Sequence, residues 1–373
     1  KTAPAVYSFK SYPQPGEGVF QQSPDSRIFT FDKGRFQAWG KVGFGIRAND
    51  HMDSVYNNYG VRYTRLYCDG KLVFASDVNN IPVSCNRMVN SWGDYDHFLH
   101  TKIWFMKSFI EPGNTLPILR AGADRGIINF NQQRDYHLRY VVSDAFGNQT
   151  VKEFTVHGEP QAIPSVAKPE GGVPLYYKKD NRINADGVRL NIQKGLLAKD
   201  GWLLMRTVPM GNALSMGYSF SKAPYPLFNY AEINIKAKDG IRNPEKLYIA
   251  ARNSAAGGGP SAYCGGIYTN GWVKGRFREL SDIYFLTSDE TAPLITKMNL
   301  DPRHLFFKIT DSGSGLKAYQ ASVDGEFILL EFGKNKEVFF CDLTETPVQR
   351  TGKERTLKVS AVDNRDNRRE FVT

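Results

Sequence analysis

The chain has 373 residues, of which 41% are hydrophobic and 23% charged, a balance typical of folded globular proteins and not of disordered ones. One hydrophobic core rarely fills this length, so two to four domains are expected. The formal net charge is +10, but Lys and Arg are dispersed without a run of five, which predicts a solvated basic surface and no nucleic-acid site. No apolar stretch approaches the roughly 20 residues that a membrane-spanning helix needs.

Residues 1–158 have the pattern of short strands joined by tight turns. In RLYCDGKLVF (65–74), alternating apolar residues flank Asp-Gly, which predicts a β-hairpin whose two turn residues have positive φ. LRYVVSDAFGN (138–148) precedes VKEFTV and predicts two late strands around a second turn. We therefore expect a β-sandwich over this range.

The first unit also contains a long insertion, SWGDYDHFLHTKIWFMKSFIEPGN (91–114), which we interpret as a lengthened loop or extra strands. Loops on rigid scaffolds often carry recognition, so this segment is a candidate binding surface. Aromatic side chains there could stack on sugars, although such residues more often fill a core. With one tryptophan of the middle domain, the candidates are Trp92, Asp94, Tyr95, Asp96, His97, His100, Trp104 and Trp272.

The rest of the chain divides by composition. Residues 159–172 are rich in Pro and Gly and predict a linker. Residues 173–289 contain short strand-like segments such as GVRLNIQKGLL and AEINIKA and predict a middle β-sandwich, and residues 290–373 predict a small third domain. Helical periodicity is weak everywhere, so the fold class expected is all-β, with three consecutive Ig-like β-sandwich domains.

The third domain repeats the order of motifs in the first. LFFKITD (305–311), ASVDGEFIL (321–329) and LKVSAVDNRDN (357–367) correspond to FGIRAND, RLYCDGKLVF and LRYVVSDAFGN. This order predicts two copies of one sandwich, with Asp, Asn and Gly where the backbone needs a left-handed residue. The structural turns are expected at Asp69, Gly70, Asp144, Gly147, Asn148, Asp311, Gly315, Asp324, Gly325, Asp363 and Asn367.

The motifs of catalysis and metal binding are absent. The sequence has no HExxH, HxH or GxSxG, and His97 and His100 alone do not supply the three or four ligands of a zinc site. DSGSG (311–315), NDHMDS (49–54) and DNRDN (363–367) could be calcium loops, but structural turns explain them better. We predict no catalytic residue, no metal and no cofactor in this chain. No CxxC pair occurs among Cys68, Cys85, Cys264 and Cys341, and whether Cys68 and Cys85 pair is left open.

The combined order of these motifs resembles a known arrangement. It is similar to the region that follows the catalytic domain in lysostaphin/LytM-type (peptidase family M23-like) zinc metallopeptidases of certain Gram-negative bacteria. The resemblance covers nearly the whole chain, through VYSFKSYP, WGKVGFGIRAND, YGVRYTRLYCDGKLVF, IEPGN, YHLRYVVSDAFGNQTVKEFTVHG, GGIYTNGWVKGRFRELSDIYFLTSDETAP and DSGSGLKAYQASVDGEFIL.

The family's zinc ligands, a His and an Asp together with a His-x-His pair, have no counterpart in this sequence. The resemblance therefore implies a non-catalytic accessory region in a periplasmic, outer-envelope or secreted protein. It also implies that zinc belongs to a peptidase domain upstream of Lys1, where a signal peptide is expected too.

Three functions follow as hypotheses. The first is an accessory region that positions a peptidase or binds envelope polymer, either peptidoglycan or another glycan, or an envelope protein. The alternative is a carbohydrate-binding or adhesin-like surface protein. The third is an enzyme within the insertion, around Asp94, Asp96, His97 and His100, which the sequence supports least.

Overall fold

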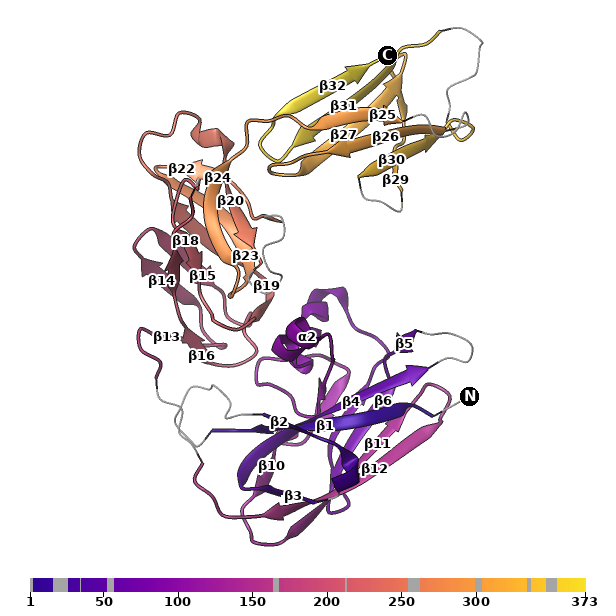
Figure 1. Ribbon diagram of the computed structural model, residues 1–373, viewed down its shortest axis with the longest axis vertical. Helices are drawn as coiled ribbons and strands as arrows, with labels where there is room; N and C mark the ends of the chain where they lie inside the picture. Colours follow the sequence, from indigo (N-terminus) through magenta and orange to yellow (C-terminus); the bar gives the residue numbers. More distant parts are fainter. Residues whose placement is uncertain are drawn as a thin grey trace.

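The computed structural model describes residues 3–15, 26–33, 35–51, 57–163, 168–211, 213–253, 262–298, 304–333, 337–346 and 354–373. The protein is all-β, and three β-sandwich units follow one another along the chain (Figure 1). Each unit has its own buried hydrophobic cluster. The Pro- and Gly-rich segment expected as a linker joins the first two units, and its residues 164–167 lie outside the described residues.

The first domain consists of two six-stranded sheets packed face to face. One has the order β10-β4-β1-β2, with β5 and β8 also paired to β4, and the other has the order β3-β12-β11-β6-β7-β9. The strands are β1 (Ala5–Pro13), β2 (Arg27–Phe29), β3 (Arg35–Ala38), β4 (Gly40–His51), β5 (Asn58–Tyr59), β6 (Tyr63–Cys68), β7 (Lys71–Asp77), β8 (Met106–Lys107), β9 (Leu119–Ala121), β10 (Ile128–Phe130), β11 (Asp135–Ser143) and β12 (Gln149–Gly158).

Phenylalanine rings fill the space between these sheets. Phe9 of β1 is fully buried, and its ring stacks on Phe154 of β12 with centroids 4.2 Å apart. The Phe36 ring meets Phe9 edge-on at 4.8 Å. Because aromatic rings bury large apolar areas, this contact between the sheets makes a large contribution to the stability of the first domain.

The insertion of the first domain (91–114) contains one extra strand, β8, which pairs with β4, and it also contains helix, which the sequence did not predict. Helix α1 (Val89–Trp92) ends inside the insertion and α2 (Tyr95–Thr101) lies within it. The 3-10 helix η2 (Val83–Met88) precedes it, and a further 3-10 helix, η1 (Phe31–Lys33), lies near β3. The Asp94 side chain accepts a hydrogen bond from the His97 N–H at the start of α2, which is the usual way to cap a helix. Helices of four and seven residues are too short to show helical periodicity in the sequence.

The middle domain pairs two five-stranded sheets, β14-β15-β19-β23-β22 and β17-β18-β24-β20-β21, with a small sheet of β13 and β16 beside them. The elements are β13 (Val173–Leu175), β14 (Asn181–Ala185), β15 (Val188–Ile192), β16 (Gly201–Leu203), β17 (Arg206–Val208), β18 (Gly217–Ser219), β19 (Pro226–Lys236), η3 (Pro244–Lys246), β20 (Leu247–Arg252), β21 (Ala262–Tyr263), β22 (Ile267–Thr269), β23 (Trp272–Glu279) and β24 (Ile283–Ser288).

The third domain consists of two four-stranded sheets, β25-β26-β30-β29 and β28-β27-β31-β32. Its strands are β25 (Leu294–Met298), β26 (His304–Thr310), β27 (Leu316–Val323), β28 (Glu326–Ile328), β29 (Glu331–Phe332), β30 (Val338–Asp342), β31 (Leu357–Asp363) and β32 (Arg368–Val372).

The first and third domains share one strand order, as their sequences predict. The order β12-β11-β6-β7 of the first matches β32-β31-β27-β28 of the third, and the pair β1–β4 matches β25–β26. The Asp-Gly hairpins also correspond. Asp69 and Gly70 have φ of 49° and 79°, and Asp324 and Gly325 have 50° and 88°, as a type I′ turn requires.

The Asp…Asn turns are the closest match between the two copies. Asp144 Oδ1 accepts hydrogen bonds from the N–H groups of Phe146 and Asn148, and Asp363 Oδ1 accepts from those of Arg365 and Asn367. In both turns the asparagine amide donates to the other oxygen of the aspartate. The left-handed position is Gly147 in the first copy, with φ of 91°, and Asp366 in the third, with φ of 59°.

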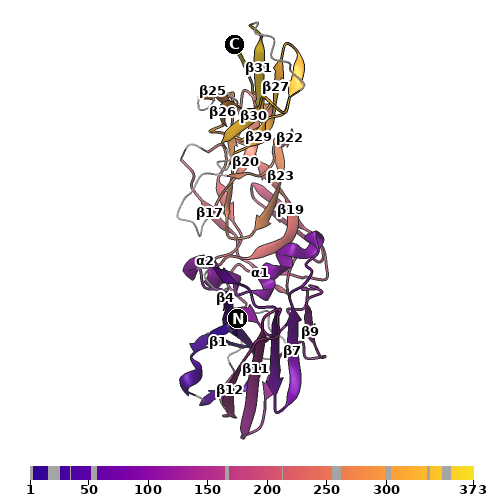
Figure 2. The ribbon, with the colours of Figure 1, turned by 90° about the vertical axis from the view of Figure 1, so that its right-hand side faces the viewer.

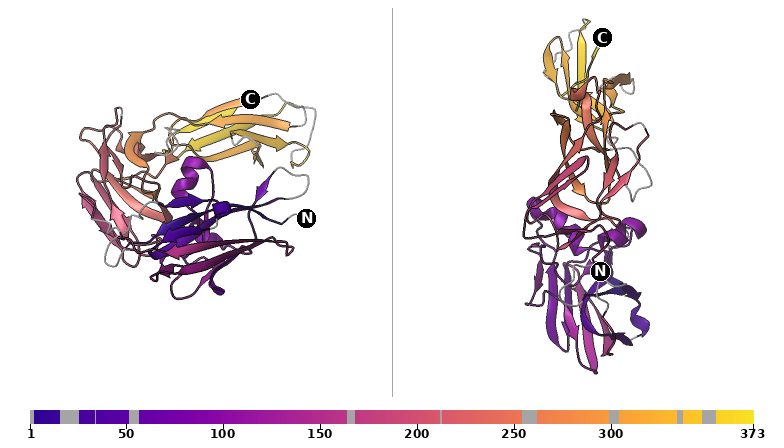
Figure 3. Two further views of the ribbon diagram at one scale, coloured as in Figure 1. Left: turned by 60° about the horizontal axis from the view of Figure 1, so that its bottom comes forward. Right: turned by 90° about the vertical axis from the view of Figure 1, so that its left-hand side faces the viewer.

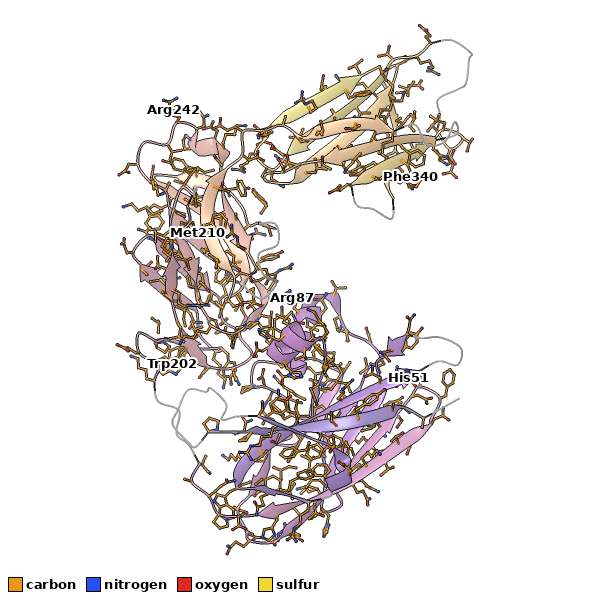
Figure 4. The ribbon with its side chains drawn as sticks, viewed as in Figure 1. His51, Arg87, Trp202, Met210, Arg242 and Phe340 are labelled. Atoms are coloured by element: carbon orange, nitrogen blue, oxygen red, sulfur yellow. The ribbon has the colours of Figure 1, made fainter. Side chains whose placement is uncertain are left out.

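The domains are joined by direct contacts between them. The helices α1 and α2 lie where the first domain meets the middle one (Figure 2), and the views of Figure 3 show the same succession of units. Gly113 N–H donates to the Ala198 carbonyl over 2.6 Å, and Arg87 Nε donates to the Leu227 carbonyl over 3.0 Å (Figure 4). Lys199 Nζ lies 3.5 Å from the buried carboxylate of Glu111.

Two further features concern membrane-spanning helices and the cysteines. Among the described residues no helix is long and apolar enough to cross a membrane. Cys68, Cys85, Cys264 and Cys341 are all free thiols, so the pairing of Cys68 with Cys85 that the sequence left open does not occur here.

Candidate binding surface

The two tryptophans expected at a binding surface of the insertion are instead packed into the first domain. Trp92 is 5% exposed, and its Nε1 donates to the Lys107 carbonyl over 3.1 Å. The Trp104 ring is half-buried and meets Phe98 edge-on at 5.3 Å. Its indole also lies against Gly93, where a Cβ atom would come within 2.1 Å of the ring. Trp92 therefore offers no ring face to a ligand, and part of the Trp104 ring is covered.

Asp94 has a structural role in the same insertion. Its Oδ2 accepts hydrogen bonds from Lys10 Nζ over 2.5 Å and from the Tyr12 hydroxyl over 2.9 Å, while Oδ1 caps α2 through His97 N–H. Although burial opposes it, the bond to Lys10 and the charges of Lys10 and Lys107 hold the pKa of Asp94 below its usual value. Asp94 thus anchors the insertion to β1 as an ionised carboxylate.

Tyr95 lies at the contact between the first and middle domains. Burial first, and then the charge of the Glu279 carboxylate at the end of β23, raise the pKa of Tyr95. Glu279 is itself half-buried, and this burial raises its pKa to about 7, although Oε1 accepts hydrogen bonds from the Tyr225 and Ser281 N–H groups. The nearby charge of Asp282 contributes to this rise. Tyr95 therefore belongs to a domain contact.

Asp96, His97 and His100 remain near the surface of α2. Asp96 and His100 are exposed, and a carboxylate oxygen of Asp96 lies 3.2 Å from His100 Nδ1. His97 is half-buried against Phe105, with ring centroids 5.3 Å apart, and burial lowers its pKa. Trp272 lies in a different domain, where the Arg189 guanidinium covers its ring at 3.9 Å. The eight residues therefore do not form one site.

The structure places in the first domain a cleft that sequence reasoning missed. It has a volume of about 980 Å³ and lies beside β1, β2 and β3, with residues after β12 on its other side. The aromatic residues Phe29 and Trp39 line it together with polar side chains that include Arg27, Arg35, Gln37 and His157. Its lining residues come from four separate stretches of the chain, so no local motif could identify it.

A small ionic network borders this cleft. Arg35 Nη2 lies 3.0 Å from the Asp135 carboxylate, and His157 Nδ1 lies 2.6 Å from the same oxygen. The hydrogen bond from His157 first, and then the charge of Arg35, hold the pKa of Asp135 below its usual value. His157 Nε2 also lies 3.6 Å from Glu159. The cleft thus combines aromatic surface with hydrogen-bond donors and acceptors of both charges.

Within the described parts of the chain, one group of three potential metal-binding side chains occurs. It consists of Asp289, Asp311 and Asp363 and lies between the middle and third domains, away from both the insertion and the cleft. It contains no histidine, so it does not provide the His and Asp set of a zinc endopeptidase.

Comparisons with known proteins bear mainly on the middle domain. No curated protein matches the chain. Solved structures that overlap with it include one described under "host cell surface retention of a 1.5-MDa bacterial ice-binding adhesin", at 10% identity over 91% of this chain and 92% of that one, with a TM-score of 0.16. Another contains the M60 catalytic domain with the CBM51-1 and CBM51-2 domains from Clostridium perfringens ZmpB, at 9% identity over 100% of this chain and 39% of that one, with a TM-score of 0.10.

At such TM-scores the two overlaps carry no argument about fold or function. A family model described as a Zu5-like domain matches residues 173–289, which are the residues that the sequence assigns to the middle domain. This match spans less than half of the chain, so it describes one domain and not the whole protein. The middle domain is similar to Zu5-like domains.

Proposed function

We propose that this chain is a non-catalytic binding region of an extracellular or cell-envelope protein, and that the cleft of the first domain holds a glycan. The cleft carries this proposal. Sugars present apolar C–H faces that pack on aromatic rings and hydroxyl groups that need hydrogen-bond partners. Phe29 and Trp39 supply aromatic rings for the apolar faces of a sugar. Arg27, Arg35 and Gln37 supply hydrogen-bond partners for its hydroxyl groups.

The cleft is also large enough for such a ligand. Sites for small ligands usually measure about 300–1,000 Å³, so about 980 Å³ accommodates several sugar units. The cleft lies on a rigid scaffold, because β1 and β3 belong to opposite sheets of a well-packed sandwich. The domain contacts described above would hold this binding unit in a defined position relative to the rest of the protein.

The test is a binding assay of the whole chain on insoluble peptidoglycan and on an array of polysaccharides. We expect saturable binding to at least one glycan, lost on Trp39→Ala and weakened on Gln37→Ala. Trp202→Ala is the matched control, because Trp202 lies in the small sheet of the middle domain (Figure 4). Absence of binding to every glycan, or equal binding by Trp39→Ala and the wild type, would refute the proposal.

A second function is favoured by the motif order in the sequence. As the accessory region of an M23-like zinc metallopeptidase, the chain would position a peptidase on peptidoglycan in the periplasm or outer envelope. The coding sequence upstream of Lys1 decides this. A peptidase domain with the His, Asp and His-x-His ligands would support it, and another type of domain there would exclude it.

A further inference from the structure

Three aspartates from separate parts of the chain meet at the junction of the middle and third domains. Asp289 follows β24 and begins the connection to β25, Asp311 follows β26, and Asp363 is the last residue of β31. One carboxylate oxygen from each lies within 4.8 Å of the other two. Asp363 is 0% exposed and Asp289 is 4% exposed, whereas Asp311 is half-buried.

Backbone N–H groups fix the orientation of these carboxylates. Asp289 accepts from Thr291 and Ser314, over 3.1 and 2.7 Å. Asp311 accepts through Oδ2 from Gly313 and Gly315, and the Asp363 carboxylate is held by its own turn. An ionised carboxylate has about four acceptor positions, so each group keeps lone pairs for a further partner.

The negative charge of the cluster is not balanced by protein side chains. Across the described ranges, no Lys, Arg or His forms an ion pair with Asp289, Asp311 or Asp363. Three carboxylates this close repel one another strongly in a partly desolvated site, unless a cation lies between them.

A buried hydroxyl group provides a second and independent sign of a missing ligand. Ser314 is 2% exposed, and its Oγ makes no hydrogen bond of acceptable geometry with any described residue. This hydroxyl lies close to the Asp289 carboxylate. Buried polar atoms are rarely left without a partner, because a buried group that has lost its water and gained no hydrogen bond destabilises the fold.

We propose that Asp289, Asp311, Asp363 and the Ser314 hydroxyl bind one calcium ion. Calcium lies about 2.3–2.6 Å from its oxygen ligands, so two ligands on opposite sides of it are about 4.6–5.2 Å apart. The three carboxylate oxygens all lie within 4.8 Å of one another, close enough to surround one such ion. Calcium accepts about 6–8 oxygen ligands in flexible geometry, whereas magnesium needs a near-ideal octahedron, so an irregular set of side chains from separate segments favours calcium. Water completes the shell on the side of Asp311, which solvent reaches.

Such an ion would join the connection between the domains to the third sandwich. Asp289 belongs to the connection, whereas Asp311 and Asp363 end strands of the two opposite sheets of the third domain. Gly313 lies so close to the Asp289 carboxylate that a Cβ atom there would come within 2.3 Å of it. Calcium would therefore fix the angle between the middle and third domains.

The first domain provides a matched control. Asp50 is the sequence counterpart of Asp311, and Asp144 is that of Asp363. Asp144 has the same hydrogen-bonded turn as Asp363, but the described residues around it contain no group of three acidic ligands. An Asp50→Asn variant thus removes the corresponding carboxylate from a sandwich that should not bind the ion.

The experiment is calorimetric titration of the whole chain with calcium chloride, and separately with magnesium chloride, after treatment with a chelator. We expect one calcium per chain, a rise in the unfolding temperature with calcium, and at least about tenfold weaker binding for Asp311→Asn and Ser314→Ala. Both variants keep the backbone N–H groups that hold Asp289 and Asp311. Asp50→Asn should bind calcium as the wild type does.

Three results would overturn the proposal. One is the absence of both binding heat and thermal stabilisation at about 10 mM calcium, which is above the range of extracellular calcium modules. The second is unchanged calcium affinity in both Asp311→Asn and Ser314→Ala. The third is magnesium binding tighter than calcium binding. Circular dichroism of each variant, recorded beforehand, excludes loss of binding through unfolding.

Discussion

Arg365 of the third domain donates a hydrogen bond from Nη1 to the carbonyl oxygen of Gly266 in the middle domain, over 2.6 Å. The same nitrogen lies 2.8 Å from the Leu247 carbonyl. In return, Lys246 Nζ of the middle domain donates to the Arg365 carbonyl over 2.8 Å. One turn of the repeated sandwich is thus the contact by which the third domain is attached to the middle one.

Replacing Arg365 by alanine should loosen this junction and leave both sandwiches folded. Hydrogen bonds of a charged group contribute about 1.5–3 kcal/mol each when they are buried. Because Arg365 is half-exposed, we expect Arg365→Ala to lower the coupling free energy between the middle and third domains by about 2 kcal/mol in total. Small-angle scattering should show a broader range of interdomain distances. Arg369→Ala, an exposed change on β32, is the control. Identical scattering of the two variants would show that the contact does not set the domain angle.

Glu279 predicts a pH dependence of stability. Burial raises its pKa from the ordinary value of 4.5 to about 7, so the folded state binds a proton that the unfolded state releases within this window. The contribution of Glu279 to the free energy of unfolding is therefore greatest below about pH 4.5. It falls by up to about 3 kcal/mol as the pH rises to about 7. Denaturant titrations at several pH values measure this slope.

The variant Glu279→Gln should remove that slope. Glutamine is uncharged and still offers Oε1 to the N–H groups of Tyr225 and Ser281. Other carboxylates contribute their own pH dependence, so the relevant quantity is the difference between variant and wild type. Glu326→Gln, an exposed change in the third domain, should leave the pH dependence unaltered. A Glu279→Gln profile parallel to that of the wild type would contradict the raised pKa.

Asp94 and Asp96 distinguish structural from recognition roles in the insertion. Asp94→Ala leaves the Lys10 ammonium buried without its anion and removes the cap of α2, so we expect a loss of about 3–5 kcal/mol of unfolding free energy. Asp96 is exposed, and Asp96→Ala should change stability by less than about 0.5 kcal/mol. Thermal unfolding of the two variants checks this. Equal stability would mean that the Lys10–Asp94 pair contributes nothing.

The fold could be predicted from the sequence where local chemistry determines it. Asp-Gly between alternating apolar residues specifies a type I′ turn, and both hairpins have that geometry at Asp69 and Asp324. The equal strand orders of the first and third domains follow from the repeated motifs in the same way. The short helices were missed because capping by Asp94 and packing against β1, and not periodicity, stabilise them.

The sites could not be predicted, because they depend on contacts between distant segments. The cleft beside Trp39 is lined by residues from four stretches of the chain that lie far apart in the sequence of the first domain. The sequence favours a structural turn over a calcium loop at residues 363–367. In the structure the Arg365 side chain points to the middle domain, while the Asp363 carboxylate meets Asp289 and Asp311 from other segments. A metal site assembled across a domain junction has no local spacing rule.

The two Asp…Asn turns provide a last, internally controlled prediction. Asn148 donates one side-chain hydrogen bond, to Asp144 Oδ2. Asn367 donates to Asp363 Oδ2 and to the Asp289 carbonyl, and it accepts from Lys246 Nζ. Replacement by alanine thus removes one hydrogen bond in the first copy and three in the third. The bonds to the aspartate carboxylates and from Lys246 are charge-assisted, whereas the bond to the Asp289 carbonyl is neutral and weaker. The loss of unfolding free energy for Asn367→Ala should therefore be about two- to threefold larger than for Asn148→Ala.

The measurement is hydrogen exchange resolved by domain, which compares the two alanine variants with the wild type in the same chain. Asn148→Ala should speed exchange only in β11 and β12 of the first domain. Asn367→Ala should speed it in β31 and β32 and also around Lys246, because the turn is part of the domain junction. Equal effects of the two variants, each confined to its own sandwich, would mean that the second turn forms no stabilising contact with the middle domain.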